Sequence, residues 1–158
     1  MGPGQSTAGL GEVLGAFASG VTLVTVADER DDIGTTVSAF CPVSVDPPLV
    51  LVSLMAGSYP AELLGRLDRF AVTLLAAGRP GARLMLDGVP HRRGELSGAL
   101  IPDGGLAAIE CEAVQRLPAG DHLLVIAGVA AVRYVAPGGQ PLIRFRGGYP
   151  AVGTPSPA

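Results

Sequence analysis

The chain has 158 residues, enough for one domain with its own hydrophobic core, and its apolar share of 48% is too high for a disordered protein. The formal net charge is −3, and the basic residues are eleven arginines spread along the sequence, so there is no basic stripe of the kind that binds nucleic acid or an anionic membrane. Lysine is absent, which excludes enzymes that form a Schiff base through lysine, including those that hold pyridoxal phosphate, and P-loop nucleotide hydrolases.

The first part of the chain predicts a short helix followed by a hairpin. Four apolar residues recur at the spacing of one helical face: Leu10, Val13, Leu14 and Phe17. Gly20 is expected to end this helix. Residues 21–27 are rich in Val and Thr and predict a strand, and the polar residues 28–32 form the turn into a second strand at 35–40.

The middle of the chain predicts two more strands and a helix. Pro47 and Pro48 favour an extended entry into residues 49–54, whose unbroken apolar run predicts a strand buried on both faces. Pro60 suits the first turn of a helix through residue 67, and residues 70–75 predict the next strand. Residues 78–105 are interrupted by Gly, Pro and Arg, and we expect a mobile loop region there.

The last third of the chain predicts long strands. Residues 107–117 alternate and include charges, which indicates one exposed side, and residues 122–135 are long enough for a strand that bends or bulges at Gly128. A turn at 137–139 leads to a last strand at 141–146. Many short strands with few helices, together with 23 glycines and 14 prolines, favour a mainly β barrel or sandwich over a doubly wound sheet.

These elements predict one domain at 10–149, with a disordered N-terminus at 1–9 and a flexible tail at 150–158. The N-terminus lacks the pattern of a secretory signal, and the longest apolar stretch, 123–132, is too short to span a bilayer. We therefore expect a cytoplasmic protein with no membrane partner.

Chemistry-bearing residues are few. Cys41 and Cys111 are too isolated to indicate a disulfide framework or a zinc site, and His91 and His122 form no metal-binding pair. The Gly-x-Ser-x-Gly, His-Glu-x-x-His, Cys-x-x-Cys and strand-linked Gly-x-Gly-x-x-Gly signatures are missing. Local patterns alone therefore lead no further than a soluble β-barrel domain without a metal.

Four short segments in order carry a resemblance that goes further. They are Phe-Ala-Ser-Gly-Val-Thr at 17–22, Thr-Val-Ser-Ala-Phe at 36–40 running on to Ser-Val-Asp-Pro-Pro-Leu-Val at 44–50, Gly-Asp-His at 120–122 and Arg-Gly-Gly-Tyr at 146–149. Over residues 10–149 the chain resembles the flavin reductase family, and in particular the reductase component of two-component flavin-dependent monooxygenases. The resemblance implies an FMN-binding split β-barrel of Greek-key type with a few short flanking helices, and a homodimer with the flavin at its interface.

The resemblance also implies a set of flavin-binding residues. Thr36, Val37, Ser38, Ala39 and Phe40 would line the isoalloxazine ring, where backbone amides can meet its polar edge and small side chains allow close approach. For the two hydroxyl residues of this strand, an ordinary water-facing position remains the alternative.

The flavin phosphate would lie in the loop before the Pro60 helix, because free amides at a helix N-terminus suit an anion. The flavin-binding positions implied around this loop are Ser53, Leu54, Ser58, Tyr59 and Arg83. Arg83 would supply a positive charge, and a solvated surface arginine is an equally good reading of it.

His122 and Tyr149 are the two residues implied to act at the nicotinamide. Hydride passes directly from NADH or NADPH to N5 of FMN or FAD, so His122 would orient the substrate and Tyr149 would close the pocket. A hydrogen-bonded turn histidine and a packing aromatic are the simpler alternatives. The reduced flavin would diffuse to a partner monooxygenase; the alternative function is a flavin-independent split barrel that binds or non-oxidatively transforms a small apolar metabolite in its cavity.

Overall fold

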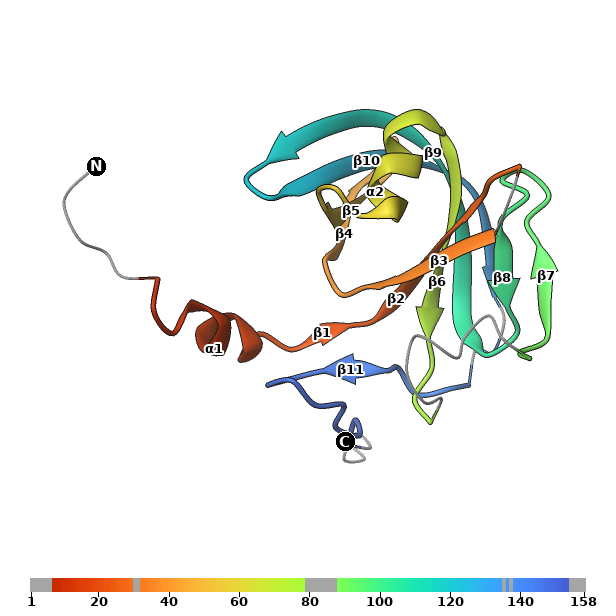
Figure 1. Cartoon of the computed structure of the whole chain (residues 1–158). Coiled ribbons are helices and arrows are strands. Elements are labelled where there is room, and N and C mark those ends of the chain that lie inside the picture. The colour runs from red at the N-terminus through yellow and green to blue at the C-terminus, as the bar shows by residue number, and fades with distance from the viewer. Residues whose placement is uncertain (1–6, 30–31, 79–87, 135, 137, 154–158) are drawn as a thin grey trace.

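A seven-stranded antiparallel sheet curls into an open barrel and forms the body of the protein (Figure 1). The computed structural model describes residues 7–29, 32–78, 88–134, 136 and 138–153. The strand order is β3-β2-β6-β9-β10-β5-β4. Its members are β2 (Thr22–Ala27), β3 (Asp32–Val37), β4 (Phe40–Val45), β5 (Pro48–Met55), β6 (Arg69–Leu75), β9 (Gly105–Ala119) and β10 (His122–Tyr134). The mainly β prediction is confirmed.

Two short strand pairs and two helices complete the fold. β1 (Ser19–Gly20) pairs with β11 (Ile143–Arg144), and β7 (His91–Arg93) pairs with β8 (Leu100–Pro102). The helices are α1 (Leu10–Gly15), which extends away from the barrel in Figure 1, and α2 (Tyr59–Arg66). Among the described residues no helix is long and apolar enough to cross a membrane.

The core fills the inside of the curled sheet. Its fully buried members come from most of the barrel strands: Val24, Val26, Val52, Phe70, Val72 and Val125. Three threonines are buried in this interior, and two of them hydrogen-bond to backbone carbonyls, whereas Oγ1 of Thr73 has no hydrogen-bond partner among the described residues. Thr22 Oγ1 donates to the carbonyl of Val37 at 2.7 Å, and Thr25 Oγ1 donates to that of Leu100 at 2.6 Å.

Helix α2 packs its apolar face into this core. Ala61, Leu63 and Leu64 are buried, and Ser58 caps the N-terminus by accepting a hydrogen bond from the amide of Ala61. Arg116 in β9 satisfies free carbonyl groups at the C-terminus of the helix. Its guanidinium donates to the carbonyl oxygens of Leu64 and Leu67 and to the carboxylate of Asp68. The helix predicted at 60–67 is therefore present, one residue earlier.

The strand predicted to be buried on both faces is buried on only one. In β5, Val50, Val52 and Leu54 face the core, whereas Leu49 and Leu51 are half-buried. The physical reason is that a single curled sheet buries only the inner face of each strand, so other elements must cover the outer face of β5. Within one chain this outer apolar face remains partly open.

The strand predicted at 35–40 ends earlier than expected. β3 stops at Val37, residues 38 and 39 form a bend, and a new strand, β4, begins at Phe40. No strand was predicted at β4, where Pro42 cannot donate a ladder hydrogen bond. The structure accommodates Pro42 in an edge strand with a register shift between Pro42 and Ser44.

The prediction of a mobile loop region at 78–105 is wrong for the residues of this range that the structure describes. Residues 91–93 and 100–102 form the β7–β8 hairpin, and Ile101 is fully buried against the sheet. Residues 79–87 lie outside the described residues.

The last strand, β11, is shorter than the predicted 141–146. The irregularities of the β9–β10 ladder fall on either side of Gly128, where a bend or bulge was expected.

Candidate functional site

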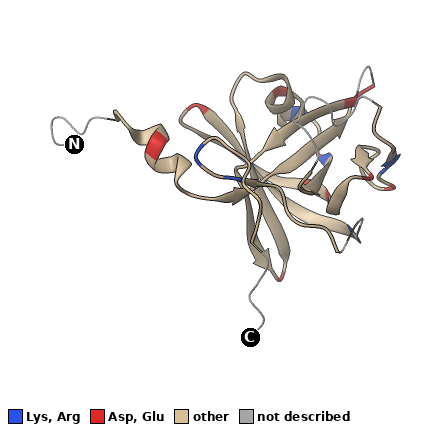
Figure 2. Cartoon of the chain, turned by 90° about the horizontal axis from the view of Figure 1, so that it is seen from below, with Lys and Arg blue, Asp and Glu red and all other residues tan. Residues whose placement is uncertain are grey.

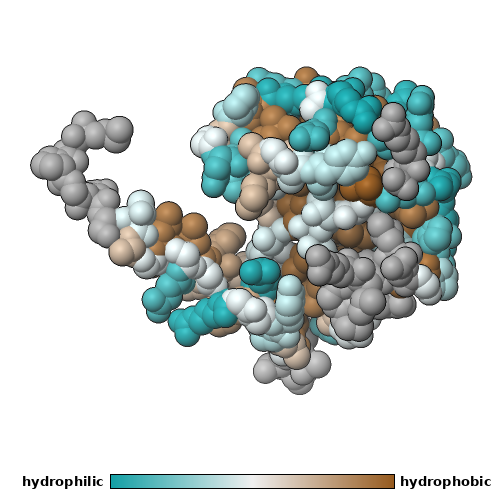
Figure 3. Space-filling model, viewed as in Figure 1, coloured by the Kyte–Doolittle hydropathy of each residue, from teal (hydrophilic) through white to brown (hydrophobic). Residues whose placement is uncertain are grey.

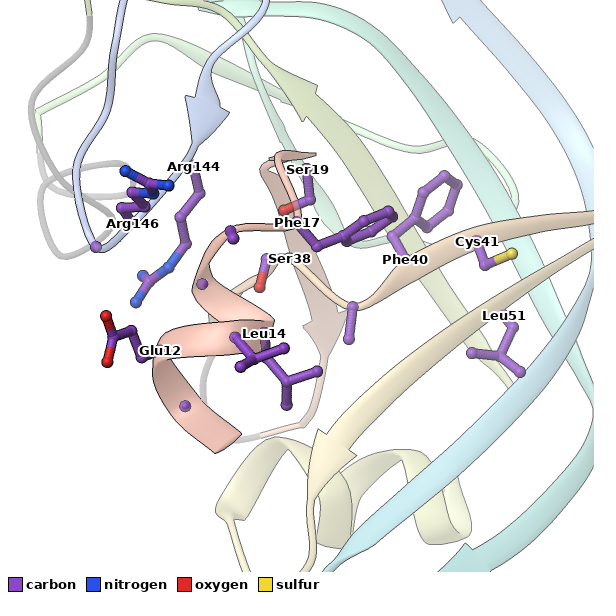
Figure 4. A pocket seen from close by; sticks show the side chains of 16 residues that line it. Glu12, Leu14, Phe17, Ser19, Ser38, Phe40, Cys41, Leu51, Arg144 and Arg146 are labelled. Atoms are coloured by element: carbon purple, nitrogen blue, oxygen red, sulfur yellow. The ribbon is translucent and has the colours of Figure 1, made fainter. Parts of the chain in front are cut away.

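A cavity of about 1180 Å³ lies between three segments. They are the N-terminal arm (residues 10–20, with α1 and β1), the bend between β3 and β4 (residues 38 and 39), and the C-terminal hairpin (residues 143–148). Figure 4 shows its lining side chains, with Phe40, Cys41 and Leu51 toward one end and Arg144 and Arg146 toward the other. The cavity thus combines an apolar end with a basic one. Sites for small molecules commonly have volumes of roughly 300–1,000 Å³, so this cavity is large enough for more than one ring system.

The bend between β3 and β4 forms one wall of the cavity. Ser38 and Ala39 carry small side chains there, and the carbonyl of Ala39 accepts a hydrogen bond from the amide of Ser53 at 3.0 Å. This bond fixes the bend against β5 while leaving the small side chains on the cavity surface. A planar ligand can approach the backbone closely at such a position.

Helix α1 forms the opposite wall and has no buried residue. Its apolar face is exposed, with Val13 at 70% and Phe17, just beyond the helix, at 79%. The space-filling view shows this apolar arm standing off the barrel (Figure 3). The helix predicted from residue 10 is present, but it ends at Gly15 instead of Gly20, because residues 19 and 20 form β1. Its apolar face lines the cavity without being buried.

The C-terminal hairpin holds the arm in place. The amide of Arg146 donates to the carbonyl of Gly15 at 2.7 Å, and β1 pairs with β11 through Ser19 opposite Arg144. Arg146 and Gly147 have φ values of 48° and 76°, so both adopt the left-handed region at the tip of the hairpin. Arginine is unusual there, because this conformation favours Gly, Asn and Asp.

The segment 36–40 is divided between the cavity and the core. Ser38, Ala39 and Phe40 line the cavity, whereas the side chain of Val37 is buried in the core. Thr36 is half-buried in β3, opposite Leu23. The structure therefore brings together the three residues of the bend.

The residues expected around a flavin phosphate lie along β5 and the start of α2. Ser53 is half-buried in β5, and Leu54 is a core residue. Ser58 caps α2, and the hydroxyl of the exposed Tyr59 lies 3.3 Å from a carboxylate oxygen of Asp28, which also pairs with Arg66. None of the four is among the residues that line the cavity described above. Arg83 lies outside the described residues.

His122 begins β10 at the tip of the long β9–β10 hairpin, beside Met55 of β5. Its Nδ1 lies 2.7 Å from Oδ1 of Asp121, and this hydrogen bond together with the charge of His122 lowers the pKa of that carboxyl group. The pairing leaves Nε2 available to a ligand. Neither His122 nor Tyr149, which is 56% exposed after the C-terminal hairpin, lines the cavity of its own chain.

A second polar cluster lies away from the cavity, behind the β7–β8 hairpin. Oε1 of the fully buried Glu110 accepts hydrogen bonds from the amides of Leu96 and Ser97 at 3.0 and 2.8 Å, and from Ser97 Oγ at 2.8 Å. Burial raises the pKa of Glu110, but these hydrogen bonds and the charge of Arg133 outweigh burial, so the net pKa is lowered. Burial also raises the pKa of the adjacent Cys111 thiol to about 12, which excludes a thiolate there at neutral pH.

Several cavity residues were not predicted as site residues from the sequence. Leu14 and Phe17 were expected only as a helix face, and Cys41, Leu51 and Arg144 were given no site role. The available signal was the unpaired apolar face of the first helix, together with two arginines spaced two apart near the C-terminus.

The cavity offers binding surfaces more than acid–base chemistry. Glu12 is its only lining carboxylate among the described residues, and no group of three potential metal ligands occurs in the described part of the chain. Cys41 and Cys111 are free cysteines, so no disulfide joins them. Such a cavity suits a reaction whose chemistry is supplied by bound cofactors.

The chain is similar to known proteins in both sequence and fold. Residues 14–153 match the family model described as "Flavin reductase like domain". The chain is 33% identical to an NADH-dependent flavin reductase of Rhodococcus sp over 148 residues, covering 89% of this chain and 83% of that protein. It is 32% identical to the reductase component of 4-hydroxyphenylacetate 3-monooxygenase from Thermus thermophilus, covering 92% of this chain and 96% of that protein.

A solved structure extends the likeness to the fold. An NADH:FAD oxidoreductase of Streptomyces globisporus, in complex with NAD and FAD fragments, superposes with a TM-score of 0.86 and 30% sequence identity, covering 94% of this chain and 93% of that one. The prediction of a split β-barrel is confirmed by this similarity.

Proposed function

This chain belongs to the flavin reductase like domain family, and we propose that it is an NAD(P)H:flavin oxidoreductase that reduces FMN or FAD. The observation that carries the proposal is the cavity at the β3–β4 bend, which combines small side chains and an aromatic residue with an open side. The relatives described as NADH-dependent flavin, FMN or FAD reductases support the same reaction.

The residues of the cavity fit a flavin. Ser38 and Ala39 leave room at the bend for a flat ring, and Phe40 offers an apolar surface beside them. With the ring held at Ser38, Ala39 and Phe40, a bound flavin would supply N5 as the acceptor of a hydride from the reduced nicotinamide, so the protein would need no acid or base at the reacting carbon. The work of the chain is to hold two rings in contact and exclude water, which can account for much of a rate enhancement.

We propose that the active form is a homodimer. The apolar residues of α1 are exposed, as are Val43 and Val45 on edge strand β4, and the outer face of β5 is only half covered. An isolated six-residue helix is unstable in water, so α1 needs a surface to pack on. A second copy would cover these surfaces and close the cavity, which α1 itself lines.

A homodimer also gives His122 a place in the reaction. The β9–β10 tip that carries it projects from the barrel (Figure 1), and His122 does not line the cavity of its own chain. We propose that this tip reaches the cavity of the second copy, where His122 contacts the nicotinamide and Tyr149 helps to close the site. The hydrogen bond to Asp121 would fix the orientation of the imidazole ring.

We propose that the reduced flavin leaves for a partner monooxygenase in the cytoplasm. The relatives named as reductase components of monooxygenases support this role. In Figure 2 the acidic and basic residues of the described chain are interspersed along the barrel, which gives no indication of a nucleic-acid partner.

The test is oxidation of NADH and NADPH by the purified protein, followed at 340 nm with and without added FMN or FAD. We expect oxidation that requires flavin and production of reduced flavin under anaerobic conditions. Riboflavin, FMN and FAD titrated by fluorescence then identify the preferred flavin. Oxidation that is absent with every flavin would contradict the proposal.

A further inference from the structure

Two arginines at the cavity differ from all the other arginines that the structure describes. Each of the others lies within 4.0 Å of a carboxylate: Arg66 with Asp28, Arg69 with Glu112, Arg92 with Asp103, Arg93 with Asp32, Arg116 with Asp68 and Arg133 with Glu95. Arg144 and Arg146 have no such partner among the described residues, and both line the cavity. Their positive charges are therefore not neutralised by the fold.

The backbone at this point is also unusual. Arg146 is the only non-glycine residue of the described chain with positive φ, and its guanidinium lies 5.1 Å from the ring centre of Phe145. A left-handed arginine is disfavoured relative to glycine. The fold nevertheless places this residue in the hairpin that carries Arg144 to the cavity edge (Figure 4).

We infer that Arg144, with Arg146 beside it, binds a phosphate group of a nucleotide that occupies the cavity; this inference rests on the proposed flavin reductase function. The cavity has an apolar end at Phe40 and Leu51 and a basic end at the two arginines. A nucleotide with a flat ring and a charged tail matches this polarity. Guanidinium groups bind phosphate through paired hydrogen bonds, which gives orientation as well as attraction.

The phosphate can come from the flavin or from the diphosphate of the nicotinamide cofactor. Glu12 on α1 is the one carboxylate among the described lining residues, and the two arginines leave an excess of one positive charge. Replacing Glu12 by glutamine should therefore strengthen binding of the same phosphate that Arg144 binds.

The experiment compares ligands with and without phosphate: FMN differs from riboflavin only by its phosphate, and NADH carries a diphosphate-containing part that a simple dihydronicotinamide lacks. Binding of FMN and of riboflavin is measured by fluorescence, and the KM is measured for NADH and for the phosphate-free donor 1-benzyl-1,4-dihydronicotinamide. We expect Arg144→Gln to weaken one phosphate-bearing ligand on the order of tenfold, with little effect on its phosphate-free counterpart. A change confined to FMN identifies the flavin phosphate, and one confined to NADH identifies the part of the nicotinamide cofactor that carries the diphosphate.

The matched control is Arg92→Gln, which removes one exposed arginine charge from the β7–β8 hairpin, outside the cavity lining. Arg144→Lys should recover part of the lost affinity, because it restores the charge without the planar fork. Equal affinities of wild type and Arg144→Gln for all four ligands would overturn the inference, as would equal losses for ligands with and without phosphate. A wild type that oxidises neither donor refutes the proposed function instead, and the FMN–riboflavin comparison still tests Arg144.

Discussion

Replacement of Glu110 measures how strongly one buried carboxylate holds the β7–β8 hairpin to the barrel. In Glu110→Ala, the two amides and the Ser97 hydroxyl lose the oxygen that accepts their hydrogen bonds, and Nε of Arg133, 3.7 Å from Oε2, loses its buried counter-charge. Removing one partner from a buried charged network costs about 3–5 kcal/mol. For a chain of this size, that corresponds to a melting temperature lower by roughly 6–20 °C.

Glu110→Gln separates charge from shape. The amide oxygen can still accept all three hydrogen bonds, but each bond is weaker because its acceptor is no longer charged. A neutral side chain also costs less to bury, so we expect the free energy of unfolding to fall by roughly 1–3 kcal/mol in total. Glu95→Gln is the matched control, because Glu95 pairs with the same arginine at 3.0 Å while its side chain is 79% exposed. An exposed pair contributes about 0–1 kcal/mol.

Urea denaturation and thermal unfolding of the three variants and the wild type provide the measurement. The pKa of Glu110 is lowered from 4.5, so its contribution to stability is complete above that pH and is lost as the pH falls through the lower folded value. The stability difference between wild type and Glu110→Gln should therefore shrink below pH 4.5. If Glu110→Ala costs no more than Glu95→Gln at pH 7, the buried network does not hold the hairpin.

Four further outcomes follow from the site and its surroundings. Ser38→Leu should fill the bend and weaken flavin binding on the order of tenfold or more while the melting temperature stays within a few degrees, and unchanged flavin affinity would place the flavin elsewhere. His122→Ala should raise the KM for the nicotinamide and lower the rate on the order of 10 to 100-fold with flavin affinity retained; complete loss would indicate acid–base chemistry instead. Leu14→Asp should shift sedimentation from dimer to monomer, and a wild type already monomeric at micromolar concentration would refute the dimer. Gly94→Ala should destabilise the β7–β8 hairpin in thermal unfolding, because an added Cβ would overlap the Glu110 carboxylate, whereas Gly65→Ala, which meets open space, should not.

The predictions from sequence succeeded where a local pattern determines the structure. Pro60 at a helix start and the Val- and Thr-rich stretch at 21–27 define their elements without help from distant residues. β4 was missed because Pro42 argues against a strand, and only pairing with β5 at the sheet edge compensates for it. The β7–β8 hairpin was missed for a related reason, since its hydrogen bonds to Glu110 join segments that are not adjacent in sequence.

In the candidate site, too, some features follow from local sequence and others only from contacts between distant residues. The motif at 36–40 contains three residues that line the cavity, but the sequence does not show the bend, which places Ser38 at the cavity and Val37 in the core and is held by the hydrogen bond from Ser53 to Ala39. The phosphate-binding role inferred for Arg144 could not be predicted from its neighbours in the sequence. It rests on the position of Arg144 at the cavity and on the absence of a carboxylate partner among the described residues.

The pairing of β1 with β11 joins two segments that lie far apart in the sequence, with Ser19 opposite Arg144 and Gly20 opposite Ile143. Contacts between distant segments form more slowly than contacts close in sequence, because a longer loop must be closed first. We therefore expect the cavity between α1 and the C-terminal hairpin to form after the local hairpins of the barrel.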